Sequence, residues 1–166
     1  SIYRHAGGGG TYARTNPIAV VGGTDIIYYS AGGAGSDSWG NVNTNSAPSS
    51  SATGALGKAG TNGTQYSPGS YGSGSIGDLI YVGGLGGSVT QPSGGGGGGY
   101  DGPGSYLTAG GDTSGLSPST LMGGGLGGVN PGNWGSIPGG GGASTAFTGL
   151  NTSGGAGRVR IHFTQY

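Results

Sequence analysis

The hydrophobic positions of this chain gather chiefly in four short segments that predict β-strands. Three of them, at 18–21, 26–29 and 79–82, are rich in β-branched or aromatic residues and lie beside Gly, Asp or Pro. The fourth, at 158–166, alternates hydrophobic and polar residues with the two-residue period of a half-buried strand. The 3.6-residue period of an amphipathic helix is absent. We therefore predict that these strands supply the only conventional hydrophobic core.

Runs of glycine separate the hydrophobic segments, and one stretch has a strict period. Glycine recurs every third residue from position 54 to position 72, with Tyr66 replacing it at one step. Three residues per turn is the period of the polyproline-II helix, which has no internal hydrogen bonds and directs every backbone group outward. Such helices pack side by side only where the facing residue has no Cβ. The spacing predicts packed polyglycine-II helices.

The glycine content of each run predicts its depth in such a bundle. A helix with three residues per turn has three ridges, so an unbroken run at 94–99 suits an interior position. The runs at 83–87 and 123–128 expose one ridge, which carries Leu85 and Leu126. The stretch at 54–72 has a single glycine ridge and is expected on the outside.

Composition and charge exclude a disordered linker and several classes of partner. Glycine supplies 48 of 166 residues, yet five Lys/Arg balance five Asp/Glu, so little self-repulsion opposes a compact state. The neutral chain offers no basic stripe for nucleic acid and no apolar run long enough to span a membrane. We predict one domain over 1–166: an irregular, all-β-like fold with packed polyglycine-II helices, a few short β-strands and no α-helix.

The chain lacks the residue clusters that catalysis or metal binding requires. His5 and His162 lie near opposite ends, the five Asp residues are isolated in the sequence, and there is no Cys. General acid–base and nucleophilic chemistry need titratable partners within hydrogen-bond reach. The glycine runs also lack the flanking strand, helix and Lys-Ser/Thr pair of a phosphate-binding loop. We predict no catalytic residue, no metal site and no cofactor.

Aromatic residues in the connections are the best candidates for a binding site. Segments at 36–53, 88–93, 100–122, 129–138 and 143–153 are rich in Ser, Asn, Thr and Pro, which predicts surface loops. Loop Tyr and Trp give large rigid contact areas and stack on sugars or pack against proteins. Alternatively, they cover the ends of the glycine bundle. The candidate receptor-binding residues are Trp39, Tyr66, Tyr71, Tyr100, Tyr106 and Trp134.

These features together resemble the glycine-rich domains at the ends of bacteriophage tail-fibre proteins and the tail-fibre adhesins of T-even-type phages. The resemblance lies in the glycine runs, in the strand-to-glycine transition at 77–84 and above all in the closing Gly-Gly-Ala-Gly at 154–157 followed by an alternating segment. It implies a polyglycine-II sandwich whose loops contact a bacterial outer-membrane protein or surface glycan. The location it implies is the virion or the extracellular space.

Two other functions remain open at this stage. A structural subunit of a virion or extracellular fibre would pair with other fibre chains or copies of itself, for which a terminal strand at 158–166 is a template. An ice-binding protein would use a flat face of the bundle, although the aromatic loops and the irregular glycine frame argue against it.

Overall fold

The structure, a computed structural model, contains five short strands and describes residues 5–88, 94–99, 102–104, 127–128, 135, 137–142 and 154–163. The strands form an antiparallel pair, β1–β5, and a three-stranded antiparallel sheet in the order β2-β3-β4. These described residues contain no helix, which confirms a non-helical fold with a few short strands. The strands are β1 (Tyr12–Arg14), β2 (Ile27–Ser30), β3 (Ser38–Val42), β4 (Gly54–Gly57) and β5 (Leu79–Tyr81).

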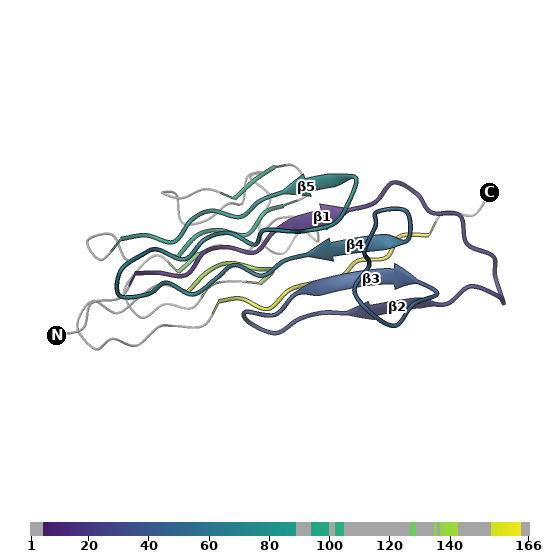
Figure 1. Cartoon of the computed structure of the whole chain (residues 1–166), viewed down its shortest axis with the longest axis horizontal. Helices are drawn as coiled ribbons and strands as arrows, with labels where there is room; N and C mark the ends of the chain where they lie inside the picture. The colour runs from purple at the N-terminus through teal and green to yellow at the C-terminus, as the bar shows by residue number, and fades with distance from the viewer. Residues whose placement is uncertain are drawn as a thin grey trace.

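The molecule is elongated and has two regions along its long axis (Figure 1). Strands β1 to β5 and the connections from β1 to β2, from β2 to β3 and from β3 to β4 occupy one half, which we call the strand region. In the other half, extended segments run side by side along the same axis. We call this half the glycine region, and its described segments are 5–11, 58–72, 82–88, 94–99 and 137–142.

Local sequence accounts for two of the five strands. β2 and β5 coincide closely with the predicted segments at 26–29 and 79–82, whose aromatic and branched residues favour a pleated backbone. β1 pairs with β5 so that Tyr12 and Tyr81 face each other, with ring centroids 6.5 Å apart and the ring planes inclined by 25°. This stacked cross-strand pair joins the start of the chain to its middle.

Segment 5–11, at the centre of the glycine region, forms backbone hydrogen bonds to three neighbouring segments, and the order of these neighbours repeats every three residues. Its seven consecutive N–H groups donate in turn to carbonyls in segments 58–64, 84–87 and 139–142, so each neighbour receives every third donor. Because the acceptor numbers fall as the donor numbers rise, all three neighbours run antiparallel to 5–11. The pairs are His5–Thr64, Ala6–Gly87, Gly7–Gly142, Gly8–Thr61, Gly9–Gly84, Gly10–Gly139 and Thr11–Lys58, at 2.6 to 3.1 Å.

Glycine is required in this region because the backbones approach one another too closely for a side chain. A Cβ on Gly9 would overlap the carbonyl of Gly96, and one on Gly8 would overlap the carbonyl of Ser70. All of 94–99 is buried, whereas Leu85 is 44% exposed between buried glycines. Both placements agree with the depth predicted from the glycine content.

In the part of the chain that the structure describes, the predicted strands do not form a hydrophobic core. Among the described residues only Ala6 and Leu56 are buried hydrophobic side chains, while Val21 is 64% exposed and Ile26 is 54% exposed. Val21 and Ile26 flank the turn at 22–25, and in the glycine region the packed backbones leave no space between them for larger side chains.

Two predicted strands and one predicted loop also need correction. Segment 18–21 forms no strand because none of the described strands pairs with it: β2, which follows it, pairs with β3. In the turn between the two segments, Thr24 and Asp25 both donate their N–H groups to the Val21 carbonyl. Residues 158–163 of the closing segment are not in a strand either, and 164–166 lie outside the described residues. The predicted loop at 36–53 contains β3, which is held by strands on both sides.

Candidate functional site

The six aromatic candidates divide into three that the structure describes and three that lie outside the described residues. Trp39 was expected on a loop, but it lies in the middle strand β3 and is half-buried. It faces Ser30 on one side and Leu56 on the other, so pairing with two strands explains the difference. The candidates outside the described residues are Tyr100, Tyr106 and Trp134.

Tyr66 is the most exposed aromatic side chain of the described residues, at 86%. It sits in a turn stabilised by Thr64, whose hydroxyl accepts hydrogen bonds from the N–H groups of Tyr66 and Ser67 at 3.2 and 3.0 Å. The Thr64 N–H donates to the Ser67 carbonyl. Tyr71 lies further along the same strip of chain and is 39% exposed. The turn therefore presents Tyr66 to solvent on a fixed backbone.

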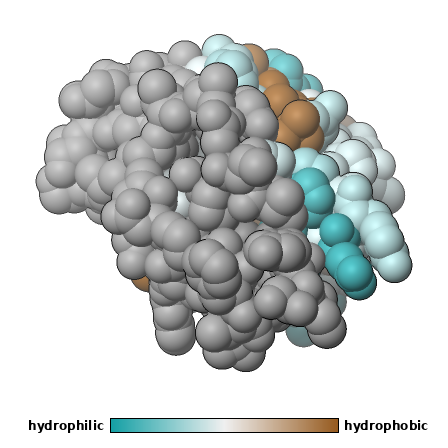
Figure 2. Space-filling model, turned by 90° about the vertical axis from the view of Figure 1, so that its left-hand side faces the viewer, coloured by the Kyte–Doolittle hydropathy of each residue, from teal (hydrophilic) through white to brown (hydrophobic). Residues whose placement is uncertain are grey.

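Tyr66 and Trp39 lie in different regions of the molecule. The Thr64 carbonyl bonds to the N–H of His5, which places the Tyr66 turn at the N-terminal end of the glycine region, whereas β3 lies in the other half (Figure 1). Figure 2 views the molecule from that N-terminal end. The described surface there is mainly hydrophilic, with a small hydrophobic group near its upper edge. The described aromatic candidates thus do not converge on one surface.

The sequence did not predict a second exposed group of large side chains in the strand region. Val21, Ile26 and Tyr29 are all more than half exposed, although they belong to segments predicted as core strands. The signal that could have revealed them is the Gly-Gly-Thr-Asp turn between the two segments, since a tight turn leaves its flanking residues at a loop tip.

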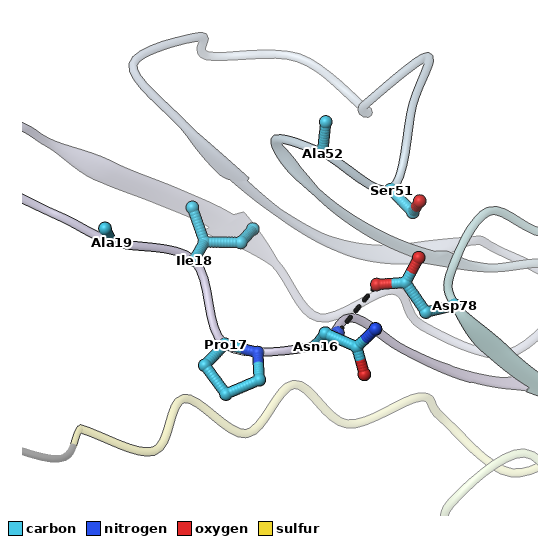
Figure 3. Close-up of a pocket in the computed structure, with 7 residues that line it drawn as sticks. All are labelled: Asn16, Pro17, Ile18, Ala19, Ser51, Ala52 and Asp78. Atoms are coloured by element: carbon cyan, nitrogen blue, oxygen red, sulfur yellow. Dashed lines mark hydrogen bonds between the residues drawn. The ribbon is translucent and has the colours of Figure 1, made fainter.

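An open pocket of about 440 Å³ lies where β1, the β3–β4 connection and the start of β5 meet (Figure 3). Three stretches of chain line it: 16–19 after β1, 51–52 before β4, and Asp78 before β5. In Figure 3 the Asp78 carboxylate and the Ser51 side chain point toward each other. Ile18 and Ala52 add hydrophobic surface. The lining thus combines an acidic group, polar groups and an apolar wall.

The Asp78 carboxylate is the electrostatic feature of this pocket. One of its oxygens accepts a hydrogen bond of 2.7 Å from the N–H of Asn16. That bond, followed by a hydrogen bond from the Ser51 side chain, lowers the pKa of Asp78 below its ordinary value, while slight burial acts in the opposite direction. The group is therefore ionised at neutral pH and offers further acceptor positions to a ligand.

The other two described Asp residues have structural partners. The hydrogen bond from the Asn43 amide, and then that from the Val21 N–H, lower the pKa of Asp25. Burial acts to raise the pKa of Asp37, but the ammonium of Lys58 at 2.7 Å and the N–H of Ala59 lower it overall. These two carboxylates hold backbone segments in place.

No metal centre is formed by the residues that the structure describes. Among them no three His, Cys, Asp or Glu side chains come together in a group that could hold an ion. The same part of the chain has no helix with the length and apolar character needed to cross a membrane. His5 and His162 belong to no such group.

Comparison of the chain with protein-family profiles, with curated proteins and with solved structures found no match.

Proposed function

We propose that this protein is a non-catalytic receptor-recognition domain at the tip of a bacteriophage tail fibre, acting on the virion outside the host cell. The observation that carries the proposal is that backbone atoms stabilise the fold in one part of the molecule, which leaves side chains at the turns available for binding. Backbone bonds between glycines hold segment 5–11 to its neighbours, so side chains are not needed there for stability. At turns such as 64–67 the identity of the side chains can therefore change without loss of these backbone bonds. A rigid scaffold with variable turns suits recognition.

We propose further that the glycine segments are polyglycine-II helices. In support, three successive N–H groups of segment 5–11 donate to three different neighbours, and the fourth returns to the first neighbour. This repeat of three matches the number of residues per turn in that helix. Overlap of an added Cβ with backbone at Gly9, Gly86 and Gly95 supports the same packing.

The receptor is a bacterial outer-membrane protein or a surface glycan. Tyr66 supports this assignment because an exposed Tyr on a fixed turn offers both an apolar ring and a hydroxyl donor at little entropic cost. The contact surface includes Tyr66 and Tyr71 from the described part of the chain. Tyr100, Tyr106 and Trp134 are proposed from the sequence alone.

The test is binding of the purified chain to whole bacteria and inhibition of phage adsorption on the same strains. We expect the wild-type chain to do both, and Tyr66→Ala to weaken binding about tenfold without changing the unfolding temperature, since the side chain is exposed. Tyr12→Phe is the matched control because Tyr12 stacks on Tyr81 within the fold. Absence of binding across a broad panel of strains would refute the proposal.

The alternative of a fibre subunit loses part of its basis. It relied on a terminal strand at 158–166 as the template, but residues 158–163, the part of it that the structure describes, are not in a strand. The residues just before them bond within the chain. Gly155 donates its N–H to Gly140, and Gly157 donates to Gly32, at 2.6 and 2.8 Å. We therefore favour recognition over polymerisation.

A further inference from the structure

The pocket beside Asp78 has the size and the mixed lining of a small-ligand site. Its volume of about 440 Å³ falls in the lower part of the range of roughly 300–1,000 Å³ for such sites. Three stretches that are far apart in the sequence converge there, and the 2.7 Å bond from the Asn16 N–H to Asp78 fixes two of them relative to each other. The pocket is therefore set by the fold and not by one mobile loop.

The polar groups of the pocket suit a ligand with several hydroxyl groups. A carboxylate has about four acceptor positions and the bond from the Asn16 N–H occupies one of them, so positions remain for hydroxyl donors of a ligand. Within the described residues, the side-chain amide of Asn16 makes no hydrogen bond, and it lies beside the carboxylate at the pocket wall. Carboxylate, amide and hydroxyl together can accept from and donate to neighbouring hydroxyls.

The apolar lining and the charge narrow the choice of ligand. Ile18 and Ala52 supply apolar surface that can contact the C–H groups of a sugar ring. The ionised Asp78 disfavours phosphates and other anions. None of the described residues that line the pocket is aromatic, so they form no cage of the kind that recognises quaternary ammonium groups. The described lining contains one carboxylate, that of Asp78, which is fewer oxygen ligands than a calcium ion needs.

We infer that this pocket binds one neutral sugar unit of a bacterial surface glycan, with Asp78, Asn16 and Ser51 bonding to its hydroxyls and Ile18 and Ala52 contacting its ring. The inference rests on the proposed recognition function and adds a glycan contact in the strand region to the contact proposed around Tyr66 in the glycine region. A single sugar in an open pocket binds weakly, with a Kd of about 1 mM, and repeated engagement of a polymeric glycan strengthens attachment.

The first experiment measures binding of neutral hexoses and deoxyhexoses to the purified full chain by saturation-transfer NMR and titration. Asp78→Asn removes the charge at nearly constant volume, and Ala52→Phe fills the pocket from an exposed position. We expect each variant to weaken sugar binding at least tenfold. Asp25→Asn is the matched control, because Asp25 also accepts a backbone N–H and a side-chain amide, and its effect should stay within about twofold.

The second experiment separates this inference from the proposed function. Cells are incubated with wild-type chain, with Ala52→Phe, and with wild-type chain plus the sugar that binds best. Cell binding that Ala52→Phe and free sugar both reduce supports the inference. Cell binding that neither changes, or absence of any sugar binding by the folded wild-type chain, overturns the inference but leaves the proposed function standing. Sugar binding without cell binding in any strain keeps the pocket assignment and overturns the proposed function.

Discussion

The hydrophobic core is small, and the glycine region and the strand region are stabilised by different interactions in its place. In the glycine region, segment 5–11 is held by backbone hydrogen bonds to three neighbours, and each bond contributes roughly 0.5–1.5 kcal/mol net. In the strand region, side chains take part: Leu56 is buried, Tyr12 stacks on Tyr81, and Asp37 binds Lys58. One region depends on the absence of side chains and the other on their presence.

The comparison shows that glycine has two distinct roles in one chain. At Gly9 it is needed for space, because backbone atoms of Gly96 and Gly97 occupy the position of a Cβ. At Gly23 the surroundings are empty, but φ is +76°, a conformation that L-residues rarely adopt. Substitutions at matched positions can therefore separate steric exclusion from backbone strain.

The largest effect is expected for Gly9→Ala. The new Cβ would overlap backbone of segment 94–99, which has no flexible side chain to move aside. We expect a loss of about 3 kcal/mol in the free energy of unfolding, measured by chemical denaturation. Gly33→Ala is the control, since nothing lies within 4 Å of its Cβ position, and it should leave stability unchanged or slightly higher. Equal stability of the two variants would contradict close backbone packing.

Leu56→Ala is expected to have the next largest effect. Leu56 is 6% exposed, and its truncation removes buried surface and leaves a cavity, which costs about 2–3 kcal/mol. Leu85→Ala, in the glycine region, should change stability by less than about 0.5 kcal/mol because that side chain is exposed. Thermal unfolding of the two variants measures the difference. If Leu85→Ala destabilised the chain as much as Leu56→Ala, side chains would matter equally in both regions.

Gly23→Ala tests strain without a steric clash. Forcing Ala into a positive φ costs about 1 kcal/mol, with no contribution from contacts at this open site. The neighbouring Gly22 is equally open but has no positive φ, so Gly22→Ala should be neutral. The pair is compared by denaturant midpoint at constant slope. A neutral Gly23→Ala would show that the turn relaxes to another conformation.

The smallest effect is expected for Asp37→Asn, which removes the ion pair to Lys58. Both side chains are about one-third exposed, so solvent screening limits the loss to about 0.5 kcal/mol at pH 7. Because the pKa of Asp37 is lowered in the folded chain, its contribution is present above the unfolded-state value near 4. It is lost as pH falls through the folded value. Wild type and variant should therefore converge in acid, and a constant difference between pH 7 and pH 3 would contradict the ion pair.

The part of the fold that could be predicted from the sequence is the part with a local signal. The three-residue glycine spacing predicted which positions face a neighbour: Gly57, Gly60 and Gly63 approach the carbonyls of segment 5–11 in steps of three. The predicted strands at 26–29 and 79–82 reappear as β2 and β5. Periodicity and β-propensity were sufficient for these elements.

The remaining elements depend on contacts that leave no mark on local sequence. β3 has the sequence Ser-Trp-Gly-Asn-Val, and its Gly and Asn disfavour a strand; pairing with β2 and β4 overrides that preference. Which glycine segments become neighbours could not be predicted either, because one glycine backbone bonds like any other. The pocket escaped prediction for a related reason, since Asn16, Ser51 and Asp78 converge only in the folded chain.

The three-residue repeat of hydrogen-bond partners around segment 5–11 has a consequence for folding kinetics. The partners are far apart in the sequence: Gly8 bonds to Thr61, Gly9 to Gly84, and Gly7 to Gly142. Contacts of such long sequence separation slow folding, because chain entropy is lost before the contacts form. During synthesis segment 5–11 leaves the ribosome well before Gly142, so its hydrogen bonds cannot be complete until Gly142 has also emerged. The protein is therefore expected to fold late and as a unit after translation has passed this point.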